Sequence, residues 1–187
     1  RLSGSRWSAD ELRRFERERR ILASLEHPGI AGLLDGGRDA EGAPYIAMQF
    51  VEGLPLDQWC AHAVPDLRTR VGVVREIAEA VAYAHARLVV HRDLKPSNVM
   101  VDGFGRARLL DFGIAHLQGE GTLTAGAQSL MTLRYAAPEQ IDARPEATSV
   151  SVDVHALGLL LYELVAGRSP HAGVRDSAAL IHAVLQV

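Results

Sequence analysis

The first stretch with a regular apolar pattern, residues 8–27, predicts a helix. Its apolar side chains recur at helical spacing: Leu12, Phe15, Leu22 and Leu25. Ser8, followed three residues later by Glu11, is a capping-box pattern for the start of this helix, and Pro28 marks its end.

Short apolar runs then replace the helical pattern. Residues 30–53 hold two such runs separated by a polar, glycine-containing segment, which predicts a β-hairpin. A second hairpin is expected around "DGFGR", with residues 99–101 running out and residues 107–110 running back. Because the strands of a hairpin end side by side, Asn98 and Asp111 should meet at its open end.

Most of the remaining apolar pattern is helical. Residues 66–90 predict an amphipathic helix whose apolar face holds Leu67, Val71, Val74, Ala78 and Val81. Residues 157–165 are apolar all round and predict a buried helix, and a last amphipathic piece follows Pro170. A small sheet with one helix, followed mainly by helices, predicts an α+β fold with two unequal lobes.

Composition and charge narrow the possible functions. The chain has 187 residues, of which 48% are hydrophobic, so it can bury a core of its own. A formal net charge of −3 gives no global attraction to nucleic acid, and glutamates interrupt the arginine-rich residues 13–20, so no nucleic-acid partner is expected. The one cysteine, Cys60, fits a reducing compartment, and the longest apolar stretch, Val154–Ala166, is shorter than the about 20 residues that cross a bilayer.

The segment "HRDLKPSN", residues 91–98, concentrates polar groups directly before the second hairpin. Oxygens of Asn98 and Asp111 can share Mg²⁺, which needs few protein ligands when phosphate oxygens and water complete its shell. Asp93 has no strand to pair with and is free to face a substrate hydroxyl, while Lys95 brings positive charge toward a transferring phosphoryl group. The segment therefore indicates phosphoryl transfer.

Three motifs in order carry a resemblance to a known family. "HRDLKPSN", then "DFG" at residues 111–113 and "APE" at residues 137–139, resemble the protein kinases, in particular bacterial serine/threonine kinases. The resemblance extends from Leu12 to about Pro170 and implies the two-lobed kinase fold. It also implies ATP and Mg²⁺ as cofactors and a protein with a Ser or Thr acceptor as partner.

The resemblance implies roles for the residues of the phosphoryl-transfer site. Asp93 would be the catalytic base or the carboxylate that orients the substrate, and Lys95 would contact the γ-phosphate. Asn98 and Asp111 would hold magnesium ions. Thr132 matches the threonine that serine/threonine kinases keep near the catalytic aspartate.

The resemblance also implies a nucleotide site. Glu18, in "FERE", matches the αC-helix glutamate that pairs with a lysine of a preceding strand. Met48 would be the gatekeeper, backbone groups of Gln49 and Val51 would bond the adenine, and Met100 would lie beneath it.

Further matched positions carry structural or regulatory roles. Phe112 and Gly113 belong to "DFG", His91 would support the loop, and Asp153 would brace the backbone of the catalytic loop. Arg92 suggests a pocket for a phosphate on the activation segment. The other members of this group are Glu139 of "APE" and the candidate phosphate acceptors Thr122, Thr124 and Ser129.

Some family parts have no counterpart here. No glycine-rich loop and no "VAIK"-like strand precede Glu18, and no arginine is available for Glu139. We therefore expect a partial kinase domain: residues 1–48 as the remnant of the small lobe without its first three strands, 49–53 as the hinge, and 54–187 as the large lobe without its last helices. Such a piece of a longer protein would bind ATP weakly and could be inactive alone.

Two other functions fit parts of the pattern. A pseudokinase or scaffold would keep the fold without the chemistry, although such proteins usually lose one of Asp93, Lys95, Asn98 and Asp111. A small-molecule phosphotransferase of the aminoglycoside-kinase type would lack Lys95 and the "APE" segment. We expect a cytoplasmic location for this segment and no membrane segment within it.

Overall fold

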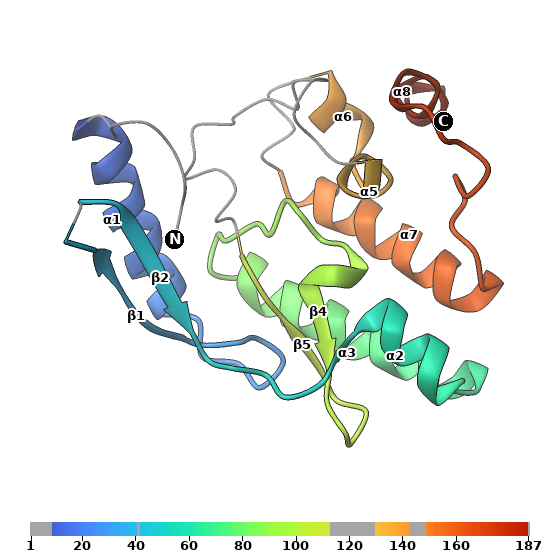
Figure 1. Cartoon of the computed structure of the whole chain (residues 1–187), viewed down its shortest axis with the longest axis horizontal. Coiled ribbons are helices and arrows are strands. Elements are labelled where there is room, and N and C mark those ends of the chain that lie inside the picture. The colour runs from blue at the N-terminus through green and yellow to red at the C-terminus, as the bar shows by residue number, and fades with distance from the viewer. Residues whose placement is uncertain (1–8, 41, 113–129, 143–148, 187) are drawn as a thin grey trace.

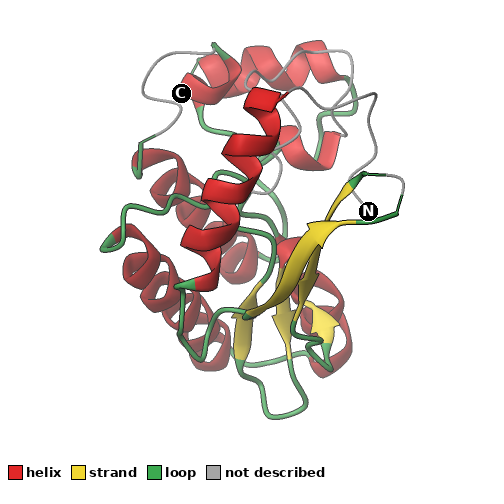
Figure 2. Ribbon diagram, turned by 90° about the vertical axis from the view of Figure 1, so that its left-hand side faces the viewer, coloured by secondary structure: helices red, strands yellow, loops and turns green. Residues whose placement is uncertain are grey.

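The computed structural model describes residues 9–40, 42–112, 130–142 and 149–186. Helix α1 (Ala9–Ala23) lies alongside an antiparallel hairpin of strands β1 (Leu33–Arg38) and β2 (Pro44–Met48) (Figure 1 and Figure 2). The Phe15 side chain is fully buried, and the Arg19 guanidinium donates to the carbonyl of Gly36. The first helix and the first hairpin are therefore where the sequence predicts them; Ser8, the expected cap, lies outside the described residues.

A three-stranded antiparallel sheet forms the second β element. Its order is β3 (Leu54–Pro55), β4 (Val99–Val101) and β5 (Ala107–Leu109), and Val99 pairs with Leu109. The Asp102 carboxylate closes the β4–β5 turn by accepting the N–H groups of Phe104 and Arg106 at 2.9 and 3.0 Å. The predicted second hairpin is confirmed, and β3 joins it as a short edge strand that the sequence analysis missed.

Helices make up most of the rest of the fold (Figure 1). The longer ones are α2 (Leu56–Ala63), α3 (Leu67–His85), α7 (Ser151–Ala166) and α8 (Ser177–Leu185). Three short helices of three or four residues are the 3₁₀ helix η1 (Pro96–Asn98) and the α-helices α5 (Leu130–Leu133) and α6 (Pro138–Ile141). Among the described helices, none is both long enough and apolar enough to cross a membrane.

The main core lies between α3, α7 and the β4–β5 ribbon. Helix α3 begins at Asp66, whose carboxylate accepts the Thr69 N–H at 2.8 Å. Its buried residues are Val73, Val74, Ile77, Ala80, Val81 and Ala84. The predicted face was right at Val74 and Val81 but wrong at Leu67 and Val71, which are 57% and 44% exposed. Helix α3 contains so many apolar residues that helical spacing fits two overlapping apolar faces, and spacing alone does not identify which of the two is buried.

Among the described residues, two stretches of chain attach the α1 and β1–β2 unit to the rest of the fold: residues 24–32 and residues 49–53. In the first, the Leu109 N–H donates to Gly29 at 2.8 Å and the Ala31 N–H donates to Leu109 at 2.9 Å, so the chain after α1 lies on strand β5. The second is the segment 49–53, which runs from β2 into β3. Gly53 ends this second connection directly against β4.

Replacing Gly53 with alanine should destabilise the fold. An added Cβ would clash with the carbonyl oxygen of Val101, a backbone atom that cannot rotate away. We expect the free energy of unfolding to fall by about 1–3 kcal/mol in urea denaturation. Gly158→Ala is the control, because no atom lies within 4 Å of its added Cβ and alanine favours a helix by about 0.5–1 kcal/mol. Equal stability of the two variants would contradict the close approach at Gly53.

Candidate active site

A buried carboxylate of helix α7 anchors the segment 91–98. Asp153 is 1% exposed, and its Oδ2 and Oδ1 atoms accept the backbone N–H groups of His91 and Arg92, each at 2.8 Å. His85, at the end of α3, reaches the same carboxylate with Nε2 at 2.7 Å from Oδ2. Three hydrogen bonds compensate the burial of this charge and connect α3, α7 and the loop.

His91 is fully buried beneath the loop. Its Nε2 lies 2.9 Å from the Leu110 carbonyl oxygen, to which it donates, and its Nδ1 faces the Asp93 N–H at 3.4 Å as an acceptor. Burial lowers the pKa of His91, which agrees with a neutral ring that donates at one nitrogen and accepts at the other. The ring also packs on Phe112, with 4.6 Å between ring centroids, so the "HRD" and "DFG" segments are in contact.

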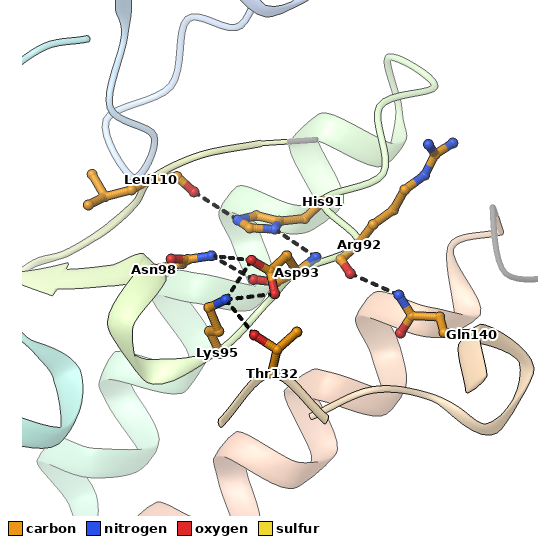
Figure 3. Close-up of polar contacts among 8 residues, drawn as sticks. All are labelled: His91, Arg92, Asp93, Lys95, Asn98, Leu110, Thr132 and Gln140. Atoms are coloured by element: carbon orange, nitrogen blue, oxygen red, sulfur yellow. Dashed lines mark hydrogen bonds and ion pairs between the residues drawn. The ribbon is translucent and has the colours of Figure 1, made fainter. Parts of the chain in front are cut away.

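Asp93 lies at the centre of a polar cluster (Figure 3). Lys95 Nζ donates to both carboxylate oxygens of Asp93, at 3.0 and 2.7 Å, and to Thr132 Oγ1 at 3.0 Å. Asn98 Nδ2 donates to the Asp93 carbonyl at 2.8 Å and to its Oδ2 at 3.1 Å. The structure thus brings together four residues that the sequence places up to 39 positions apart: three lie within residues 93–98, and the fourth, Thr132, comes from α5.

The two predicted metal ligands stand at the open end of the β4–β5 ribbon. The Leu110 N–H donates to the Asn98 carbonyl at 2.9 Å, so Asp111 follows directly after the residue opposite Asn98. The Asn98 amide nitrogen is used by Asp93, which leaves its Oδ1 as a ligand. Although Asp111 remains exposed, desolvation by surrounding protein raises the pKa of its carboxyl group, and the Asp93 carboxylate adds to this. A carboxylate and an amide oxygen are ligands that suit a hard divalent cation.

The residues predicted for a nucleotide lie along β2, the segment 49–53 and β4. Met48 is the last residue of β2 and is half-buried, as is Met100, which faces away from the core side held by Val99 and Val101. The Gln49 N–H donates to Gly32 at 2.8 Å, so its carbonyl is the group left for a ligand. Glu18 belongs to α1, but its side chain lies outside what the structure describes, as do Gly113, Thr122, Thr124 and Ser129.

Glu139 has a partner that the sequence analysis did not foresee. Its Oε1 atom accepts a hydrogen bond from Ser151 Oγ at 2.8 Å, at the start of α7. No arginine was expected for this glutamate, and a serine hydroxyl takes that place among the described residues. The "APE" segment is therefore tied to α7, the helix that also carries Asp153.

Besides Ser151, three contacting groups escaped the sequence analysis. His85 gives no signal beyond its place near the end of a helix, and the Leu110 carbonyl is a backbone atom that no motif marks. Gln140 follows "APE", and its Nε2 donates to the Arg92 carbonyl at 2.9 Å (Figure 3). The one available hint was its proximity to the motif.

The assembled groups match what phosphoryl transfer requires. That reaction needs a carboxylate for the attacking hydroxyl, positive charge near the transferred group and oxygen ligands for a cation. The protein kinase domain profile matches residues 2–187, and the chain belongs to the protein kinase family. The predicted α+β kinase fold is confirmed.

Several bacterial relatives are similar over most of the chain. The probable serine/threonine-protein kinase PknB of Lactococcus lactis is 38% identical over 169 residues, which cover 90% of this chain and 26% of the relative. The serine/threonine-protein kinase PrkC of Bacillus subtilis is 36% identical over 163 residues, 87% of this chain and 25% of the relative. PknJ of Mycobacterium tuberculosis is 37% identical over 172 residues, 90% and 29% respectively. The chain thus spans about a quarter of the length of these curated relatives.

Asp153→Asn should destabilise the fold strongly. The amide can accept with one oxygen only, and its NH₂ group would face a backbone N–H that has lost its acceptor. We expect the free energy of unfolding to fall by about 2–4 kcal/mol, measured by chemical denaturation. Glu79→Gln is the control, because this exposed residue makes only a 3.7 Å surface pair with Arg75, worth less than about 1 kcal/mol. A loss at Asp153 no larger than at Glu79 would refute the anchoring role.

Stability should decrease as the pH falls from about 7 to about 5.5. Burial lowers the pKa of His91, His155 and His171 below the ordinary 6.5, so below that pH the unfolded chain binds protons that the folded chain does not. Their contribution is complete above pH 6.5 and is lost on acidification. Urea denaturation at several pH values measures this slope. His91→Leu should show a shallower slope than the parent; an unchanged slope would mean that folding does not lower the pKa of His91.

Proposed function

We propose that this chain is the catalytic segment of a kinase that transfers the γ-phosphate of ATP to Ser or Thr hydroxyl groups of proteins. The observation that carries the proposal is the half-buried Asp93 carboxylate, which forms an ion pair with Lys95 and accepts a hydrogen bond from the Asn98 amide. Asn98 and Asp111 would hold Mg²⁺, which when bound would neutralise phosphate charge.

In the proposed reaction, Asp93 orients the acceptor hydroxyl and receives its proton. The acceptor oxygen bonds to the γ-phosphorus, the bond from that phosphorus to the β–γ bridging oxygen breaks, and ADP leaves. Lys95 is placed to turn its ammonium group toward the transferred phosphoryl group, because its two partners are a carboxylate and a hydroxyl of the same site. Catalysis of this kind depends on positioning and charge.

The segment 49–53 supports an adenine site. The Gln49 carbonyl is left free by the bond of its N–H to Gly32, and the Val51 N–H has no hydrogen bond within the described part of the chain. One acceptor and one donor, two residues apart, match the edge of an adenine ring. Met48 and Met100 would contact the ring through packing, which suits methionine.

The described end of the activation segment favours a protein acceptor over a small molecule. Thr132 reaches the Lys95–Asp93 pair, and the "APE" residues are fixed to α7 through Glu139 and Ser151. A segment held in this way can form a ledge beside Asp93 for an extended peptide. The names of the relatives, serine/threonine-protein kinases, agree with this acceptor. An ATP-dependent enzyme of this kind would work in the cytoplasm.

Asp93→Asn in the full-length protein tests the proposal. An asparagine keeps the shape but accepts no proton, so we expect the rate of phosphate transfer from ATP to protein to fall by about 10²–10⁴-fold while nucleotide affinity stays the same. Phosphate incorporation and calorimetric nucleotide binding measure the two effects. Asp57→Asn, an exposed carboxylate on α2, is the matched control and should keep full activity.

Three outcomes would count against the proposal in different ways. Transfer that survives in Asp93→Asn would reject Asp93 as the base. A parent protein that binds nucleotide and transfers nothing would instead favour a scaffold. Phosphate found on an aminoglycoside and not on protein would favour a small-molecule acceptor.

A further inference from the structure

We infer that Gln140 is a positioning residue, which fixes the peptide group between Arg92 and Asp93 and thereby the direction of the Asp93 side chain. The inference rests on the proposed function for its meaning in catalysis. The structural claim, that Gln140 fixes this peptide group, rests on the geometry alone.

The Gln140 side chain uses both ends of its amide. Oε1 accepts the backbone N–H of Ala137 at 3.0 Å, and Nε2 donates to the Arg92 carbonyl at 2.9 Å (Figure 3). The first bond fixes the side chain on its own helix, α6, where it also serves as a cap. The second bond extends from this fixed side chain to the catalytic loop. An amide with both ends bonded has little freedom to move, so it transmits the position of α6 to the loop.

Arg92 needs external support because its backbone is strained. Its φ angle is +66°, in the left-handed region that non-glycine residues rarely adopt. Asp153 holds the N–H of Arg92, and Gln140 holds the C=O of the same residue. The two bonds come from different elements and fix the residue from both sides.

The consequence for Asp93 follows from the planarity of the peptide bond. The Arg92 carbonyl and the Asp93 N–H belong to one rigid group, so a bond that orients the carbonyl also orients the Cα atom of Asp93. Within the described part of the chain, the Asp93 N–H makes one hydrogen bond, a long contact of 3.4 Å to His91 Nδ1. The shorter bond to Gln140 is therefore the stronger restraint on this group.

A small cavity lies between the loop and α6, next to the hydrogen bond from Gln140 to Arg92. Its volume is about 20 Å³, room for about one water molecule, and its lining includes Arg92, Asp93, Thr132 and Gln140. The buried Nε atom of Arg92 has no hydrogen-bond partner among the described residues. If Gln140 were shortened, this space would widen and water would replace its bond to the Arg92 carbonyl without holding that carbonyl in place.

Two substitutions separate positioning from simple helix capping. Gln140→Glu keeps an oxygen for the Ala137 N–H but offers no donor to the Arg92 carbonyl, whereas Gln140→Ala loses both bonds. If capping were the whole role, the glutamate variant would behave like the parent. If the hydrogen bond to the Arg92 carbonyl positions Asp93, both variants lose that bond and should show the same functional defect. Gln58→Glu, the same change at an exposed residue of α2, is the matched control.

The first readout is steady-state phosphate transfer by the full-length protein, well below its melting temperature. We expect kcat to fall about tenfold in both Gln140 variants, with KM for ATP unchanged, since one hydrogen bond is lost at the catalytic loop and none at the nucleotide. The Gln58 variant should match the parent. A Gln140→Glu variant with the parent's kcat, or a loss in thermal stability alone, would overturn the inference.

The second readout does not require activity. Amide hydrogen exchange of residues 90–95 should be faster in both Gln140 variants than in the parent and the Gln58 variant. If the parent transfers no phosphate, the proposed function fails, but faster exchange would still support the hold on the loop. Unchanged exchange would refute it in either case.

Discussion

The arrangement of this site depends on one buried carboxylate. Asp153 gives up its hydration inside the core, and the hydrogen bonds from His85 and from two successive backbone N–H groups replace it. The bonded groups come from α3 and from the loop, while the carboxylate comes from α7. The segment 91–98 is therefore bonded directly to the helical core through Asp153, and this attachment restricts its motion.

The anchored loop tolerates a backbone that it would not adopt alone. Arg92, which precedes Asp93, and Asp111, a predicted metal ligand, both have left-handed φ angles, +66° and +55°. Such conformations persist only where the surroundings determine them, and here the surroundings are Asp153, Gln140 and the packing of His91 on Phe112. Asp93 and Asp111 lie close enough for the Asp93 carboxylate to raise the pKa of Asp111.

The sequence predicts the parts of this site that depend on local pattern. Short apolar runs and turn residues located the ribbon that follows Asn98, and the motif located Asp93, Lys95 and Asp111. Contacts between distant segments could not be read in this way: His85, Ser151 and Gln140 are ordinary polar residues whose roles arise only when α3, α6 and α7 meet. The short elements β3, α5 and α6 were missed because two to four residues carry no period, and the buried stripe of α3 was misplaced because its apolar residues fit two faces.

Two sets of hydrogen bonds fix the loop, one from Asp153 and one from Thr132 and Gln140, and they differ in how deeply they are buried. Asp153 is almost fully buried within one long helix, so breaking its bonds would disrupt the core. Thr132 and Gln140 are half-buried, lie on helices of four residues, and each make one hydrogen bond to the segment 91–98, Thr132 from the Lys95 ammonium and Gln140 to the Arg92 carbonyl. Short helices with few buried contacts open at lower cost than a core helix. The geometry around Asp93 therefore combines an anchor in the core with a second set of contacts from short helices. Within the described part of the chain, the hydrogen bonds of Thr132 and Gln140 connect the positions of α5 and α6 to the segment that carries Asp93.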